Sequence, residues 1–346
     1  MMTKSIALAT FLVMAAALVA PAQAQFETTT RTVTKRGTTA ADFLQIPVGA
    51  RATAMGGAVT ASIDDATAIY WNPAGIANLG GAFSAEYAQW LAGIDFNFMA
   101  VTMPLAGGTV GFAVTAMRTP EMEVTTISQQ NGTGEKFDAA SYAIALTYAR
   151  ALTDRFSIGG SVKSIRERIW TSTASGTAFD VGTQFVTPFR GIRLGAAITN
   201  FGTKLQLSGD DLLVRVDTDP ANRGNNESNR ALLKTDAFDL PLTMRIGLAG
   251  EVYQSASTRV TLAVEALNPN NSEQYLNVGA EIGLLGDLVM LRGGYAEILV
   301  KDPVRSFSVG AGLNYRFAPL NIAVNYAFEA QNFFEDVNRL TLAVSF

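Results

Sequence analysis

The feature that most constrains this chain is an alternation of apolar with small or polar residues, repeated in runs of about ten residues from position 82 to the end. Near the C-terminus, for example, Leu340, Leu342 and Val344 alternate with Thr341 and Ala343. A period of two is that of a β-strand, whose side chains point alternately to its two faces. Runs of this length also match the roughly 9 to 11 tilted residues with which a strand crosses the core of a membrane.

Fourteen such runs can be identified, an even number that suits a closed barrel with both ends on one side. Tight connections such as 152–153 alternate along the chain with long ones such as 119–138 and 202–240, as periplasmic turns alternate with outer loops. We therefore predict an all-β fold, a 14-stranded antiparallel transmembrane β-barrel over 82–346. The predicted strands are 82–90, 94–104, 108–118, 139–151, 154–168, 174–187, 190–201, 241–252, 258–267, 274–285, 288–297, 305–316, 319–329 and 337–346.

The composition favours a barrel in lipid over a soluble β-sandwich. The chain is 48% hydrophobic and only 16% charged, which is apolar for an exported soluble protein. A β-protein in lipid must pair all its backbone polar groups, so it spans as a closed barrel with apolar side chains outward. Tyrosine and tryptophan residues near the strand ends, such as Tyr87, Tyr142 and Trp90, suit the membrane interface.

With the apolar face outward, most charged strand residues are predicted to face the lumen. Five are acidic and five basic, so we interpret them as ion pairs that support the wall and anchor a plug; the alternative is a polar conduit. The predicted lumenal charges are Glu86, Asp95, Lys163, Asp180, Arg193, Arg245, Glu265, Glu281, Arg292 and Arg316.

Cysteine and histidine are both absent, which removes thiolate chemistry and the commonest general base and metal ligand. Asp64 and Asp65 are adjacent and have no nucleophile beside them, so we expect a structural role in capping a short helix and pairing with Arg51. The Gly310-x-Gly312 pair lies in a predicted strand and lacks the third glycine of a dinucleotide site. We expect no enzyme activity, cofactor or metal, and the net charge of −4 argues against a nucleic-acid partner.

The N-terminus carries the features of an export signal. An apolar stretch from Ile6 to Ala20 follows Lys4, and Ala22-Gln23-Ala24 has the small-x-small cleavage pattern. We predict a cleaved signal peptide at 1–24, a flexible tail at 25–37 and placement in the bacterial outer membrane.

Between the tail and the barrel, residues 38–81 follow a different pattern. They are rich in small residues and contain the motifs FLxIxxGARAxAMGGA, DDA and YWNPAG in that order. Glycine permits positive φ and Asn-Pro stops a helix, so the residues predict a compact insert of short helices and turns.

The same motifs closely resemble the N-terminal region of the PorV/PorQ family, which is related to the FadL family of outer-membrane transporters. Later segments are similar as well, among them Leu240-Pro241-Leu242-Thr243 and Leu291-Arg292-Gly293-Gly294-Tyr295. The resemblance covers nearly all of the mature chain and implies that 38–81 forms a plug, or hatch, inside the lumen. The motif residues it assigns to the plug are Arg51, Met55, Gly56, Gly57, Asp64, Asp65, Trp71, Asn72, Pro73 and Gly75.

Three functions follow as hypotheses. The first, implied by the PorV/PorQ resemblance, is a non-enzymatic component of type IX secretion that binds cargo C-terminal signal domains and translocon or attachment partners. The second is a FadL-like channel that takes up hydrophobic small molecules, for which we expect a continuous apolar tunnel. The third is a structural outer-membrane protein. Outer-membrane lipid is an expected partner of all three, and a hydrophobic small molecule or lipid is an expected ligand of the second.

Overall fold

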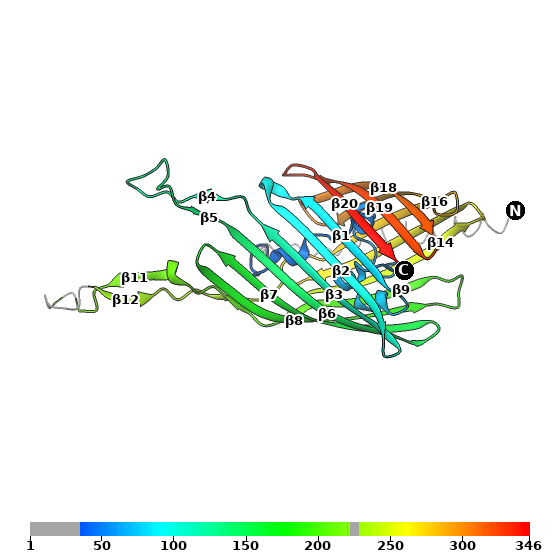
Figure 1. Ribbon diagram of the computed structural model, residues 1–346, viewed down its shortest axis with the longest axis horizontal. Coiled ribbons are helices and arrows are strands. Elements are labelled where there is room, and N and C mark those ends of the chain that lie inside the picture. The colour runs from blue at the N-terminus through cyan, green and yellow to red at the C-terminus, as the bar shows by residue number, and fades with distance from the viewer. Residues whose placement is uncertain (1–34, 220, 222–227) are drawn as a thin grey trace, which may run out of the picture.

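The computed structural model describes residues 35–219, 221 and 228–346. The predicted signal peptide, 1–24, and residues 25–34 of the predicted tail lie outside the described residues. Over the described part of the chain, fourteen antiparallel strands close into one barrel, which confirms the predicted fold class (Figure 1). They are β1 (Ala82–Gln89), β2 (Asp95–Leu105), β3 (Gly108–Arg118), β6 (Ala139–Thr153), β7 (Phe156–Ile169), β8 (Ser172–Val186), β9 (Arg193–Gly202), β14 (Thr243–Gln254), β15 (Thr258–Pro269), β16 (Tyr275–Leu284), β17 (Val289–Ile298), β18 (Arg305–Phe317), β19 (Leu320–Gln331) and β20 (Val337–Ser345).

The barrel closes between its first and last strands. Each strand pairs with its neighbours in chain order, and β1 pairs with β20 from Ala82 opposite Ser345 to Ala88 opposite Arg339. Just beyond the seam, Phe346 N donates to Gly81 O at 2.8 Å. The segment that leads into the first strand is therefore hydrogen-bonded to the end of the last.

The two faces of the wall differ in the way the alternation predicts. On β6, Ile144 and Leu146 are 47% and 59% exposed, whereas Ala143 and Ala145 between them are buried. Large apolar side chains thus point outward around the barrel, and small or polar ones point inward. The inward residues are small because the lumen is filled by another part of the same chain.

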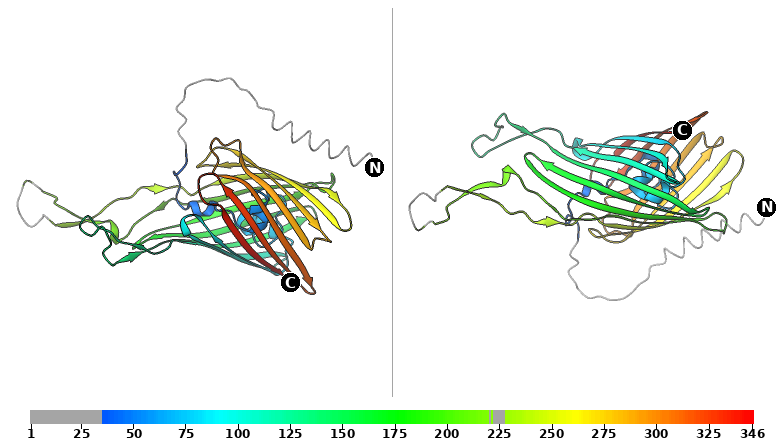
Figure 2. Two further views of the ribbon diagram at one scale, coloured as in Figure 1. Left: turned by 90° about the horizontal axis from the view of Figure 1, so that it is seen from above. Right: turned by 60° about the horizontal axis from the view of Figure 1, so that its bottom comes forward.

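The connections divide the barrel into a short-turn end and a long-loop end. Two long loops extend well beyond the barrel at the long-loop end and carry small two-stranded sheets (Figures 1 and 2). The 202–240 connection, predicted as a polar loop, contains hairpins in its described part and a short helix, η4 (Asp210–Leu212). The paired strands are β4 (Met122–Glu123) with β5 (Lys136–Phe137), β10 (Leu205–Gln206) with β13 (Ala237–Phe238), and β11 (Leu213–Val216) with β12 (Asn229–Leu232).

The segment before β1 folds inside the barrel as a plug, seen as the blue ribbon in Figure 2. It consists of turns and short helices, and a further short helix, η3, connects β1 to β2. In the described part of the chain, no helix is long and apolar enough to cross a membrane. The short helices are η1 (Asp42–Gln45), α2 (Ala50–Ala54), α3 (Ala68–Trp71), η2 (Pro73–Ile76) and η3 (Leu91–Gly93).

Glycine on the inner face of the wall lets the plug backbone rest directly against the strands. A Cβ added to Gly294 of β17 would overlap the backbone of Met55 and Gly56, and one added to Gly159 of β7 would overlap the backbone of Pro73. Plug and wall are therefore packed backbone to backbone at these points, with no side chain between them.

Candidate functional site

The plug is fixed to the wall by its own backbone N–H groups. Helix α2 begins where Gly49 N donates to the Glu86 carboxylate and Ala50 N donates to Thr341 Oγ1 at 2.8 Å. Farther along, Thr60 N donates to Glu265 Oε2 at 2.9 Å. The wall side chains thus supply acceptors for plug donors that short helices leave unpaired.

The YWNPAG motif connects the plug to itself and to the wall. The fully buried Asn72 donates to Thr60 O at 2.8 Å and to Thr183 O of β8 at 3.0 Å, and it accepts a bond from Ala74 N at 3.1 Å. Pro73 follows at the first position of η2, where its missing N–H costs no hydrogen bond. A Cβ on Gly75 would overlap Ile63 O, so the motif needs glycine there.

We expect Asn72→Asp to loosen the plug. The change replaces two amide donors with a carboxylate oxygen facing two carbonyl oxygens, at a cost of about 3 kcal/mol for a buried site. Hydrogen exchange of residues 58–77 should accelerate at least tenfold while the barrel strands keep their protection. The control is Asn97→Asp, because Asn97 is exposed on the outer face of β2; equal exchange in the two variants would contradict the role given to Asn72.

At the short-turn end, the DDA motif and Arg51 form an ion-pair cluster with the wall. Arg51 lies 2.5 Å from Asp64, 3.5 Å from Asp65 and 3.1 Å from Glu281 of β16. Burial alone would lower the pKa of Arg51, but the charges of Asp64 and Glu281 outweigh it and raise the pKa. Asp65 also accepts a bond from Thr67 N at 2.8 Å, just before α3.

Glu281 is the centre of this cluster. Its two oxygens also receive Arg292 at 2.7 Å and Arg259 at 3.3 Å, and its side chain is 1% exposed. The cluster borders a cavity of about 280 Å³ that is lined further by Arg316, Asn314 and Asn321. One carboxylate thus joins the plug to two wall arginines.

The other predicted lumenal charges mostly pair on the inner face. Lys163 lies 2.6 Å from Asp180, Arg245 lies 3.5 Å from Glu265, and Arg193 lies 3.4 Å from Glu251. Glu86 pairs at 3.0 Å with Arg339, whose side chain is fully buried. Arg316 lines the short-turn cavity, where the described residues give it no ion-pair partner.

Asp95 differs from the prediction, because it lies on the outer face. It shares that face of β2 with the exposed Met99 and Val101, and its Oδ1 accepts a bond from Tyr87 Oη at 3.0 Å. The residues between them, Phe96 and Phe98, are the ones that face inward. An acidic residue is accommodated outside because it lies at the first position of the strand, at the edge of the apolar band.

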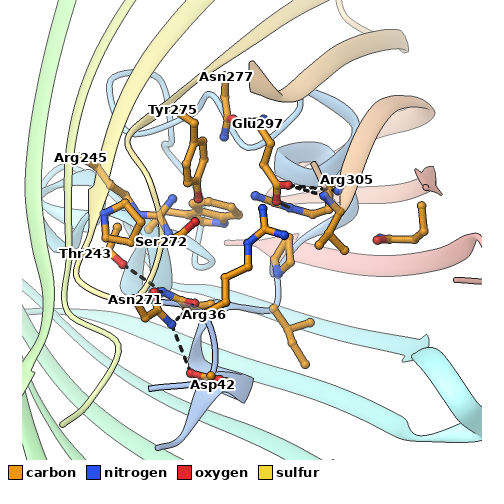
Figure 3. A pocket seen from close by; sticks show the side chains of 18 of the residues that line it. Arg36, Asp42, Thr243, Arg245, Asn271, Ser272, Tyr275, Asn277, Glu297 and Arg305 are labelled. Atoms are coloured by element: carbon orange, nitrogen blue, oxygen red, sulfur yellow. Dashed lines mark hydrogen bonds and ion pairs between the residues drawn. The ribbon is translucent and has the colours of Figure 1, made fainter. Parts of the chain in front are cut away.

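A second cavity, of about 290 Å³, opens at the long-loop end between the plug and strands β14 to β19 (Figure 3). Trp71 lines it, with Nε1 donating to Val48 O at 2.8 Å, and the Arg245 guanidinium lies 4.8 Å from the Trp71 ring centroid. Trp90 also lines this cavity, so it lies in the lumen and the prediction that placed it at the membrane interface was wrong. Tyr275 adds a third aromatic side chain.

This outer cavity is lined by more arginine side chains than acidic ones. Arg36, Arg245 and Arg305 line it together with Asp42 and Glu297. Arg305 forms an ion pair with Glu297 at 2.9 Å. Arg36, in contrast, donates to the carbonyl oxygens of Lys301 and Asp302. Burial raises the pKa of Asp42, against hydrogen bonds from Thr39 and Asn271 that lower it.

Two buried side chains on the cavity wall have polar atoms without partners. Within the described residues, the Nε of Arg245 donates to no protein acceptor, and neither the Nε2 nor the Oε1 of Gln331 is hydrogen-bonded. Both side chains are more than nine-tenths buried. An unpaired buried polar atom costs about 1 to 3 kcal/mol, so a small side-chain shift that brought these atoms to a polar occupant of the cavity would be favourable.

Several residues that face the lumen or line its cavities were not predicted from the sequence. Arg339 continues the inward face of β20 by one step beyond Thr341, so the alternation itself could have found it. Arg259, Glu297 and Arg305 lie at strand ends, where alternation does not decide direction. The alternation also puts Tyr275 and Gln331 on the inward faces of β16 and β19, but no sequence signal places them beside a cavity.

No protein-family model matches the sequence, and no curated protein matches it. Among solved structures the chain is similar to the CymD monoaromatic hydrocarbon channel, with 14% identity and a TM-score of 0.56 over 86% of this chain and 97% of that one. The Pseudomonas putida toluene transporter TodX gives 13% identity and a TM-score of 0.56 over 86% and 97% of the two chains. A Pseudomonas aeruginosa FadL homologue gives 12% and 0.52 over 87% and 98%. At these identities the likeness is one of fold, and the chain has the fold of these channels over nearly their whole length.

Proposed function

We propose that this chain is a non-enzymatic outer-membrane channel for small molecules with an aromatic or apolar body and an anionic end. The observation that carries the proposal is the outer cavity, where the Arg245 guanidinium lies 4.8 Å from the centroid of the Trp71 ring and both side chains line the space. Pockets that bind small molecules combine apolar walls with a few convergent polar groups. The fold shared with hydrocarbon channels and a toluene transporter supports the same class of function.

The apolar outer face and the signal-like N-terminus support placement in the outer membrane, with the long loops outside. In that orientation the outer cavity would receive a ligand arriving from the medium. The side chains of Trp71 and Trp90 would contact its ring, and the guanidinium groups of Arg36 and Arg245 would bind its anionic end.

The two cavities described above do not form the continuous apolar tunnel expected for a hydrophobic-molecule channel. The outer and short-turn cavities lie at opposite ends of the plug, and both are lined by charged side chains. Passage through the barrel would therefore require the plug to move, which makes the plug contacts the gate of the proposed channel.

Ligand binding can be followed by tryptophan fluorescence, because two of the three tryptophans of the chain line the outer cavity. In a Trp170→Phe background, we expect benzoate to change the fluorescence of the folded protein and to bind at least tenfold more tightly than toluene. The double variant Arg245→Gln/Glu265→Gln should lose about tenfold in benzoate affinity, since a hydrogen bond to a charged group contributes about 1.5 to 3 kcal/mol.

The control for that pair is Lys204→Gln/Asp239→Asn, which removes an exposed ion pair from an outer loop. It should leave benzoate binding unchanged. Equal affinity for benzoate and toluene, or an undiminished benzoate affinity in the Arg245→Gln/Glu265→Gln protein, would reject the proposed ligand class.

A second candidate, a type IX secretion component that binds cargo and translocon partners, is supported by the PorV/PorQ resemblance and by the projecting loops. The β4–β5 and β10–β13 loops extend beyond the barrel and expose large apolar side chains, among them Ile127, Leu232 and Leu233. Such side chains are typical of protein-binding surfaces. If deletion of the gene leaves cargo with C-terminal signal domains normally exported, this candidate is excluded.

A further inference from the structure

Three arginine residues gather on the outer face of the barrel near its long-loop end, where the wall faces lipid. Arg118 of β3 and Arg168 of β7 lie on either side of β6 and pair in register with the same residue, Ala140. One rung closer to the middle of the wall, Arg166 pairs with Tyr142. We call Arg118, Arg166 and Arg168 the arginine patch.

The register places this patch at the edge of the apolar band. Two rungs below Tyr142, the outward residues on these strands are Phe112, Leu146 and Val162, all between 44% and 59% exposed. Arg166 lies four residues beyond Val162, about 13 Å along the strand at about 3.3 Å per residue. Because barrel strands are tilted by about 35 to 45°, this corresponds to about 10 Å of height, which brings the patch to the border of a typical apolar band of about 25 Å.

The patch has more positive charge than its acidic neighbours offset. Asp138 lies 2.9 Å from Arg118 and 2.6 Å from Arg168, so a single carboxylate serves two guanidinium groups. The hydrogen bond from Arg168 lowers the pKa of Asp138. Asp95 lies opposite Arg118 in register and accepts a bond from Tyr87, so three guanidinium groups stand against two carboxylates, and the described residues give Arg166 no ion-pair partner.

We propose that the arginine patch binds a phosphate group of a phosphorylated lipid in the outer leaflet. This inference rests on the proposed outer-membrane placement and not on the ligand of the lumen. Guanidinium groups bind phosphate through paired hydrogen bonds, and Arg118 and Arg168 remain 60% and 37% exposed despite Asp138. The occupant is lipid because the wall directly below the patch is apolar, so acyl chains of the same molecule can lie on Phe112, Leu146 and Val162.

The test measures lipid binding to the folded full-length protein in detergent by native mass spectrometry. The probe is a bisphosphorylated, acylated glucosamine disaccharide, compared with the same lipid after removal of its phosphates. We expect the phosphorylated lipid to bind at least tenfold more tightly than the dephosphorylated one. The triple variant Arg118→Gln/Arg166→Gln/Arg168→Gln should abolish this difference.

Because the triple variant leaves Asp138 without partners, Arg166→Gln alone is the second variant, and it should weaken binding about threefold. The matched control is Arg150→Gln/Arg155→Gln, which removes two exposed arginines near the short-turn end. It should retain the full affinity, and all variants should show the same resistance to SDS at room temperature as the parent protein.

Equal binding of the phosphorylated and dephosphorylated lipids would overturn the proposal, as would full binding by the triple variant. Displacement of the lipid by millimolar inorganic phosphate would show a site for soluble anions and would also overturn the lipid assignment. Loss of binding in the triple variant, with no displacement by phosphate, would support it.

Discussion

The variant Gly294→Val is expected to unseat the plug while leaving the barrel closed. The added Cβ would overlap the backbone of Met55 and Gly56. Backbone atoms cannot relieve such an overlap by a change of rotamer, as the end of a flexible side chain can. Overpacking of this kind costs about 3 kcal/mol. We expect amide exchange across residues 50–60 to accelerate by about a hundredfold, and the conductance of the protein in planar bilayers to rise.

The neighbouring Gly293 provides a matched control on the same strand. A side chain at position 293 would point outward, like those of Leu291 and Tyr295. The nearest atom to an added Cβ would be Ser308 O, 4.0 Å away. Gly293→Val should leave both exchange and conductance unchanged. If Gly294→Val retains parental plug protection, the backbone packing of plug against wall is not what holds the plug in place.

Glu281→Gln is expected to release the short-turn end of the plug. The substitution keeps the shape of the side chain but leaves Arg51, Arg259 and Arg292 around a neutral group. Breaking a buried ion pair by removing one partner costs about 3 to 5 kcal/mol. Exchange at residues 50–66 should accelerate by at least a hundredfold.

Glu251→Gln is the control for Glu281→Gln, since Glu251 pairs with Arg193 and is about a third exposed. Surface ion pairs contribute about 1 kcal/mol or less, so this variant should leave exchange in the plug near the parental rate. A Glu281→Gln protein whose exchange matches that of Glu251→Gln would show that the cluster does not hold the plug.

The barrel was predictable because each of its strands faces two different surroundings. The lipid side demands large apolar residues such as Ile144 and Leu146, whereas the plug side demands small ones such as Ala143 and Ala145. Because successive side chains of a strand face opposite sides, this contrast produces a period of two in the sequence, and the alternating turn lengths give the strand count. The predicted strand ends agree with the structure to within a few residues.

The candidate site was less predictable, because its geometry depends on contacts between distant segments. Asp95 and Trp90 lie where a strand begins or ends, and there the alternation no longer fixes which way a side chain points. The outer cavity joins the plug to residues more than 170 positions away, such as Trp71 to Arg245. The composition of the lumen could be foreseen, whereas the shape of the space left by the plug could not.

The hydrogen bond from Phe346 to Gly81 has a consequence for how the plug is held. The chain passes from the lumen into the wall at the point where β20 meets β1, so the last residues of the plug are held by the same strand pair that closes the ring. A displacement of the plug at this end would therefore strain the closing seam itself, which couples the position of the plug to the integrity of the wall.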